Sequence, residues 1–168
     1  VRRDWSKNNK NEGGGTSFLL SGGNVFERIG VNKSTVSGKF AKEFRHKILG
    51  ANKNGKYWAS GISVVAHMRT PKIPAIHFNT RFIITTKEWF GGGMDATPSH
   101  KDVKEKKLLH DMLKKVCVQN YKNYKKYKEW CDEYFYLPHR KESRGIGGIF
   151  FDYESDNWIK NFRFVREL

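Results

Sequence analysis

The sequence predicts an α+β fold in which a large antiparallel sheet is flanked by helices. Two β-branched, apolar segments at 61–67 and 77–84 have the alternation of strands, and a third strand segment follows at 149–152. Between the second and third segments, apolar residues recur at helical spacing over 101–117 and again over 121–135. Strands and helices that occupy separate stretches in this way are typical of the α+β class.

Length and composition indicate one domain, which we place at residues 1–168. Hydrophobic residues make up 38% of the chain and aromatic residues 14%, which is enough for a packed core. No stretch approaches the roughly 20 apolar residues of a membrane span, so none is expected. The two cysteines, Cys117 and Cys131, form no CxxC pair and suggest no disulfide framework. We therefore expect a reducing, cytoplasmic location.

The net charge of +15 raises the question of a nucleic-acid partner. Residues 101–130 hold ten Lys against four Asp or Glu, but these charges are spread around the predicted helices. That distribution is typical of solvated helix faces. No zinc-finger spacing and no RNA-recognition motif is present. We expect no nucleic-acid partner, whereas an acidic small molecule also suits a basic protein.

The first two predicted strands carry polar side chains on one face. Successive side chains of a strand point to opposite faces, so alternate residues share a face. If the two strands pair, one sheet face would carry Ser63, His67, His77, Asn79 and Arg81. Such a row can be ordinary solvent-facing surface, or it can line a polar cavity, and the pattern alone leaves both interpretations open.

Three further stretches are interpreted as connections. Residues 6–15 are predicted to be a mobile lead-in, and the polar stretch 42–57 a surface connection with some helix near its start. The glycines at 91–93 are interpreted as a turn that leads to Asp95, either tight or forming a backbone nest for an anion. Their spacing matches neither a Rossmann nor a P-loop pattern, so a nucleotide site is not favoured.

Four stretches, in a fixed order, carry a family resemblance. They are Gly13-Gly-Gly with Val25-Phe-Glu-Arg-Ile-Gly-Val-Asn32, Gly61-Ile-Ser…His67 with His77-Phe-Asn-Thr-Arg81, Trp89-Phe-Gly-Gly-Gly-Met-Asp95-Ala-Thr-Pro98, and residues 130–152. The last block has 23 residues, which is too long for a chance match. On these stretches the chain resembles the oxygen-dependent coproporphyrinogen III oxidases of haem biosynthesis.

The resemblance implies an enzyme activity and a substrate. Members of the family use molecular oxygen to decarboxylate two propionates of coproporphyrinogen III to vinyl groups, which gives protoporphyrinogen IX, carbon dioxide and hydrogen peroxide. No organic cofactor is implied, and oxygen is the co-substrate. The substrate carries four carboxylates around an apolar macrocycle, which suits arginine pairs and aromatic walls. A homodimer is implied as well.

Residue roles follow from the matched motifs. The resemblance implies that His77 is a proton donor, whereas the simpler interpretation is a structural histidine on a strand. It implies that Ser63, Asn79 and Arg81 bind substrate. It also implies that Asp95 engages the pyrrole N–H groups, although outside this family such an aspartate is more often a helix N-cap.

A divalent metal is the least supported implication. His67, His77, His110 and His139 match histidines that are sometimes assigned as metal ligands in bacterial members of the family. Imidazoles bind manganese or zinc, but scattered histidines are weak evidence. His110 lies beside an apolar helix stripe, where a hydrogen-bonded core histidine is the commoner outcome. We do not expect a required metal.

Length is the main departure from the family. The resemblance implies a helix upstream of Trp5 and, beyond Leu168, a C-terminal third with more strands, a Gly-Gly-Arg substrate contact and much of the dimer interface. We therefore expect residues 1–168 alone to be inactive or barely active. The alternatives are a porphyrin-binding remnant and a basic nucleic-acid-binding module. The enzymatic interpretation requires His77, Arg81 and Asp95 to converge around one hollow.

Overall fold

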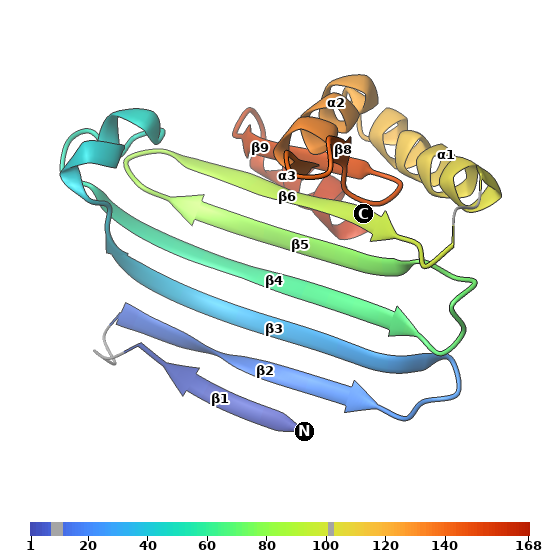
Figure 1. The fold of residues 1–168 in the computed structure, drawn as a ribbon. Coiled ribbons are helices and arrows are strands. Elements are labelled where there is room, and N and C mark those ends of the chain that lie inside the picture. Colours follow the sequence, from blue (N-terminus) through green and yellow to red (C-terminus); the bar gives the residue numbers. More distant parts are fainter. Residues whose placement is uncertain (8–11, 101–102) are drawn as a thin grey trace.

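The structure, a computed structural model, describes residues 1–7, 12–100 and 103–168. Within these residues, seven strands form one antiparallel sheet in the order β1-β2-β3-β4-β5-β6-β9 (Figure 1). The strands are β1 Arg2–Ser6, β2 Gly13–Ser21, β3 Phe26–Lys39, β4 Lys56–Met68, β5 Ala75–Ile84, β6 Glu88–Thr97 and β9 Gly148–Glu154. The first six follow one another as a meander, and β9 joins the sheet after two helices.

The remaining elements complete the α+β class that the sequence predicts. They are the 3-10 helix η2 Lys42–Lys47, the helices α1 Val103–Gln119, α2 Tyr124–Tyr134 and α3 Trp158–Glu167, and a small ribbon of β7 Tyr136–Leu137 and β8 Glu142–Ser143. Figure 1 shows that α1, α2 and α3 gather at the β6–β9 end of the sheet, while β1 to β3 extend away from them. None of the helices in the described residues is long and apolar enough to cross a membrane.

The two polar strands of the sequence pair directly. In the β4–β5 ladder Ser63 lies opposite Asn79, and Val65 lies opposite His77. Residues that lie opposite one another in a ladder point to the same face of the sheet. The shared polar face that alternation predicts is therefore present, and we call it the site face.

Two expectations for the connections are wrong. The glycines at 91–93 do not form a turn, because they lie inside strand β6 and pair with both β5 and β9. Gly13 to Gly15 are also in a strand, β2, rather than in a mobile lead-in. The rest of that lead-in includes residues 8–11, which lie outside the described residues. The helix expected near residue 42 is present as η2.

The buried core lies where the helices meet the strands β6 and β9. Its members are apolar or aromatic residues of α1, α2, β9 and α3: Leu113, Cys117, Tyr127, Ile149, Phe151 and Phe164. Burying each large side chain stabilises the fold by about 1.5–3 kcal/mol. Helix α2 begins at Tyr124 because the side chain of Asn123 accepts a hydrogen bond from the backbone N–H of Lys126 at 3.0 Å.

Helix α2 runs along the outer edge of β9. Tyr134 stacks on Phe150, with ring centroids 4.2 Å apart, and Tyr127 packs against Phe151 at 5.6 Å. Phe150 and Phe151 are consecutive in the strand, so their side chains leave opposite faces of the sheet. A helix that contacts both of them must lie beside the edge. This position brings the C-terminal end of α2 to the site face.

Candidate functional site

The site face collects the five residues to which the resemblance assigns substrate binding or catalysis. Three rows of paired residues cross the strands β3 to β6. The middle row contains Ser63 and Asn79. The row on one side of it contains Arg81, and the row on the other side contains His77 and Asp95. His77 and Asp95 are direct partners in the β5–β6 ladder. Strand β6 therefore contributes Asp95 to the sheet face, and the alternative role as a helix N-cap is excluded.

A hollow of about 350 Å³ lies on this face between the strands and the end of α2. The strands supply its polar lining, which includes Asn32, Ser63, Asn79 and Arg81. The end of α2 and strand β9 supply its aromatic wall, which consists of Tyr134, Phe135 and Phe150. His77 and Asp95 do not line this hollow, and they lie in the row beside it on the same face. The three predicted substrate-binding residues thus share one concavity. The expected convergence of His77, Arg81 and Asp95 around one hollow is met only in part, because the first and last of these lie on the same face beside it.

Arg81 is held by an ion pair on the wall of the hollow. Its Nη2 donates to Oδ2 of Asp152 at 2.8 Å, and Oδ1 of the same carboxylate accepts from Nε1 of Trp89 at 2.9 Å. The guanidinium carbon lies 5.6 Å from the ring centroid of Phe150. Gly91 leaves room for this arrangement, because a Cβ there would collide with Oδ1 of Asp152 and lie 2.9 Å from Nε of Arg81. The arginine is thereby pre-oriented before any ligand binds.

Asp95 forms a second ion pair, which the sequence did not predict. Nε and Nη2 of Arg144 donate to the two oxygens of Asp95 at 2.8 and 2.7 Å, a bidentate geometry. Asp95 is only 2% exposed. The Arg144 guanidinium carbon lies 3.7 Å from the ring centroid of Phe135, so the pair is stacked against an aromatic wall. A carboxylate held in this way is fixed in position and keeps unused lone pairs for a donor on a ligand.

His77 has a free ring nitrogen beside this pair. Its Nδ1 is buried and has no hydrogen-bond partner within the described part of the chain. Burial lowers the pKa of His77; the carboxylate of Asp95 opposes this shift, while Arg144 and His67 reinforce it. A lowered pKa makes the protonated imidazole a stronger acid. This position therefore suits a group that passes a proton to a ligand.

The four histidines considered as metal ligands do not form a metal site. In the residues that the structure describes, no group of three or more His, Cys, Asp or Glu side chains could hold a metal ion. His110 has both ring nitrogens engaged, Nε2 with the carbonyl of Ile146 and Nδ1 with the hydroxyl of Tyr124, each at 2.8 Å. His139 and His67 are exposed side chains on the β7–β8 connection and on β4. The donor set does not fit a bound metal.

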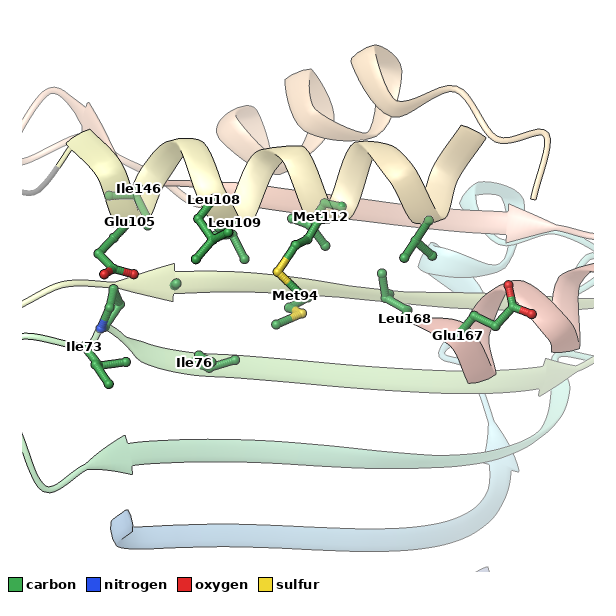
Figure 2. Close-up of a pocket in the computed structure, with 14 residues that line it drawn as sticks. Ile73, Ile76, Met94, Glu105, Leu108, Leu109, Met112, Ile146, Glu167 and Leu168 are labelled. Atoms are coloured by element: carbon green, nitrogen blue, oxygen red, sulfur yellow. The ribbon is translucent and has the colours of Figure 1, made fainter. Parts of the chain in front are cut away.

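A second hollow, of about 270 Å³, lies on the opposite face of the sheet, beneath α1 (Figure 2). Apolar side chains dominate it, among them Ile76 and Met94 from the strands and Leu109 and Met112 from α1. The charged groups at its margins are the carboxylates of Glu105 and Glu167. Carboxylates repel an anionic ligand, so this hollow suits a tetracarboxylate less well than the site face does.

Four residues of the site were missed from the sequence: Trp89, Phe135, Arg144 and Asp152. Each lies within a stretch that carries the family resemblance, and that is the signal that could have marked them. Their spacing gave no other sign, because Arg144 and Asp152 meet their partners 49 and 71 residues away in the chain.

The site face combines fixed arginines, amide and hydroxyl groups, and an aromatic wall. Such a surface suits a ligand that carries both carboxylates and apolar surface. The family profile described as coproporphyrinogen III oxidase matches residues 1–168, and the chain belongs to that family.

Curated relatives agree with this assignment. The chain is 50% identical over 170 residues to proteins named oxygen-dependent coproporphyrinogen-III oxidase from Rickettsia rickettsii (strain Sheila Smith) and Rickettsia akari (strain Hartford). It is 49% identical over 170 residues to the protein of that name from Rickettsia bellii (strain OSU 85-389). These matches cover 100% of the chain and 60% of each relative. The chain thus spans about three fifths of the length of these relatives.

Proposed function

We propose that the protein carrying this chain catalyses the oxygen-dependent oxidative decarboxylation of two propionates of coproporphyrinogen III to vinyl groups. One observation carries the proposal: Ser63, Asn79, Arg81, His77 and Asp95 lie on a single sheet face, around and beside one hollow. Membership of the coproporphyrinogen III oxidase family and the names of the relatives support it.

The hollow suits both the carboxylates and the apolar macrocycle of this substrate. Arg81 is held on one side by Asp152 and has further N–H groups that can pair with a propionate. Ser63 and Asn79 add hydroxyl and amide groups on the neighbouring row. The rings of Phe135 and Phe150 offer apolar surface to the macrocycle. In this proposal the three polar residues bind and orient the substrate.

The chemistry requires one proton for each propionate. A propionate side chain, one O2 and one proton give a vinyl group, CO2 and H2O2. The electron pair released as the carbon–carbon bond to CO2 breaks reduces the oxygen, and the electron-rich pyrrole mediates this transfer. In this proposal His77, whose pKa is lowered by burial, supplies this proton. The resemblance assigns the Asp95 carboxylate to the pyrrole N–H groups, and its bidentate pair with Arg144 fixes its position.

We extend the proposal to the cellular setting. A cytoplasmic location is supported by the two cysteines, both of which are free and buried. A homodimer is supported by the family resemblance alone. Molecular oxygen is the co-substrate, as the names of the relatives imply for those proteins, and no step of the proposed reaction uses a metal.

The test is oxygen-dependent turnover of anaerobically prepared coproporphyrinogen III. Carbon dioxide release and protoporphyrinogen formation are measured for the protein that carries this chain, and for residues 1–168 alone. Arg81→Ala and His77→Gln are compared with Lys125→Ala, whose side chain is exposed on α2. We expect turnover that the first two variants reduce and the third leaves unchanged. Binding of the substrate without carbon dioxide release would instead support a porphyrin-binding remnant.

A further inference from the structure

We propose that His110 is a positioning residue and not a metal ligand: together with Tyr124 it fixes the loop of residues 144–147, from which Arg144 reaches Asp95. The effect on turnover rests on the function proposed above. The hydrogen-bonding state of His110 does not depend on that function, so it can be measured separately.

The hydrogen bonds of His110 determine which nitrogen carries its proton. Nε2 lies 2.8 Å from the backbone carbonyl oxygen of Ile146, and a carbonyl can only accept, so Nε2 must be the N–H. Nδ1 lies 2.8 Å from the hydroxyl oxygen of Tyr124. A neutral imidazole with its proton on Nε2 has a lone pair on Nδ1, and there it accepts a hydrogen bond from the Tyr124 hydroxyl. Both nitrogens are therefore occupied, and no lone pair is left for a metal.

The carbonyl that His110 holds belongs to a loop anchored at several points. The backbone N–H of Ile146 donates to the carbonyl of Ala96 at 2.9 Å, and the N–H of Ala96 donates to the carbonyl of Gly147 at 3.3 Å. Within the loop, the N–H of Gly147 donates to the carbonyl of Arg144 at 3.2 Å. Ala96 is the residue after Asp95 on strand β6. The loop is thus fixed to the strand beside the carboxylate that Arg144 binds.

The position of Arg144 depends on this loop. Its side chain makes the bidentate pair with Asp95, and its backbone N–H donates to the carbonyl of Phe135 at 3.2 Å. On the side of the loop that faces α1, the Ile146 carbonyl is held by the imidazole of His110. If this hydrogen bond is lost, the carbonyl of Ile146 is left half-buried without that donor. The loop then moves to satisfy it, and the geometry of Arg144 and Asp95 changes with it.

A neutral histidine suits this role because it offers a donor on one side and an acceptor on the other. A glutamine amide has the same two functions, so His110→Gln can keep both hydrogen bonds. A phenylalanine fills similar space but has neither function. The pair of variants therefore separates hydrogen bonding from packing. His46, an exposed histidine of η2, supplies the matched control as His46→Gln.

The first test is nitrogen-15 NMR of histidine-labelled protein near neutral pH. We expect the His110 resonances, assigned by their absence in His110→Gln, to show a protonated Nε2 and an unprotonated Nδ1. Adding Zn²⁺ or Mn²⁺ should leave these resonances unchanged, and elemental analysis should find no metal whose stoichiometry depends on His110. A proton on Nδ1 with Nε2 free, or a bound metal that is lost in His110→Gln but not in His46→Gln, would overturn the proposal.

The second test is turnover. We expect His110→Phe to lower kcat by about 10- to 100-fold, since displacing a group near the reacting centre by about 1 Å has an effect of that size. KM should change less than kcat, because the pair of Arg81 with Asp152 is not touched. His110→Gln should recover most of kcat without added metal. Equal kcat for His110→Phe and the unsubstituted protein would refute the positioning role, whereas absence of turnover in the unsubstituted protein would count against the proposed function alone.

Discussion

A single methyl group at Gly91 is expected to disturb the arginine of the site face. The Cβ of Gly91→Ala would collide with Oδ1 of Asp152 and lie 2.9 Å from Nε of Arg81, so the ion pair must shift. Overpacking of this kind costs about 1–3 kcal/mol. Alanine regains about 0.5–1 kcal/mol over glycine in a strand interior. The net loss is therefore about 0–2.5 kcal/mol, and each kcal/mol lowers Tm by about 2–4 °C in a chain of this size.

A second glycine on the same face provides the control. A Cβ at Gly30, on strand β3, would meet no atom within 4 Å. Gly30→Ala should therefore stabilise the fold by about 0.5–1 kcal/mol through strand propensity alone. The assay is thermal unfolding followed by circular dichroism for the two variants and the unsubstituted protein. The two changes should move Tm in opposite directions, and shifts of the same sign and size would refute the steric argument.

The same substitution should weaken substrate binding. A displaced Arg81 loses one charge-assisted hydrogen bond to a propionate, which is worth about 1.5–3 kcal/mol, or roughly 10- to 100-fold in affinity. Fluorescence titration with coproporphyrin, the stable oxidised form of the substrate, measures this change. If Gly91→Ala binds as tightly as the unsubstituted protein, Arg81 does not hold the ligand in the way proposed.

Three further measurements test the energetics of the fold. Lys122→Ala should cost about 3–5 kcal/mol in urea unfolding, because it leaves the largely buried carboxylate of Glu154 without its cation. Lys125→Ala should cost less than about 0.5 kcal/mol, because that pair is exposed. Burial lowers the pKa of His77, so the unfolded chain binds more protons there and stability falls as pH drops below about 6.5. His77→Gln should flatten this loss between pH 7.5 and 5.5, and an unchanged slope would count against the buried neutral imidazole. Burial raises the pKa of Cys117 to about 11 and that of Cys131 to about 12, so neither should react with a thiol reagent at pH 8 until the protein is denatured.

Local patterns were sufficient to predict which side chains share a face. The alternation of residues 61–67 and 77–84 predicted that Ser63 and Asn79 would point the same way if the strands paired, and the ladder confirms it. Helical spacing likewise predicted α1 and α2 with a break near Asn120. These predictions succeeded because each depends on residues that are close together in the chain.

The glycines of β6 show why other predictions failed. Three consecutive glycines favour a turn when only backbone freedom is considered. At Gly91 the glycine instead leaves space for Asp152, which reaches the site from β9. The pairs that fix Arg81 and Asp95 join residues 71 and 49 positions apart, so no window of sequence contains both partners.

Helix α3 was not predicted. It follows β9 after only residues 155–157, and its apolar side chains do not all face the core. Phe164 is fully buried against α2 and β9, whereas Ile159 is 75% exposed. The apolar residues of 158–167 nevertheless recur at helical spacing, so the periodicity of this segment is the signal that could have predicted the helix.

The two edges of the sheet differ in their exposure to other molecules. Helix α2 lies along β9 and shields the hydrogen-bonding groups of that edge from a strand of a neighbouring molecule. Strand β1, at the other edge, has no such cover from a helix in the described residues, but it carries Arg2, Arg3 and Asp4. Charged side chains on an edge strand discourage intermolecular pairing. For residues 1–168 by themselves, any tendency to aggregate should therefore begin at β1 and should increase when those charges are neutralised.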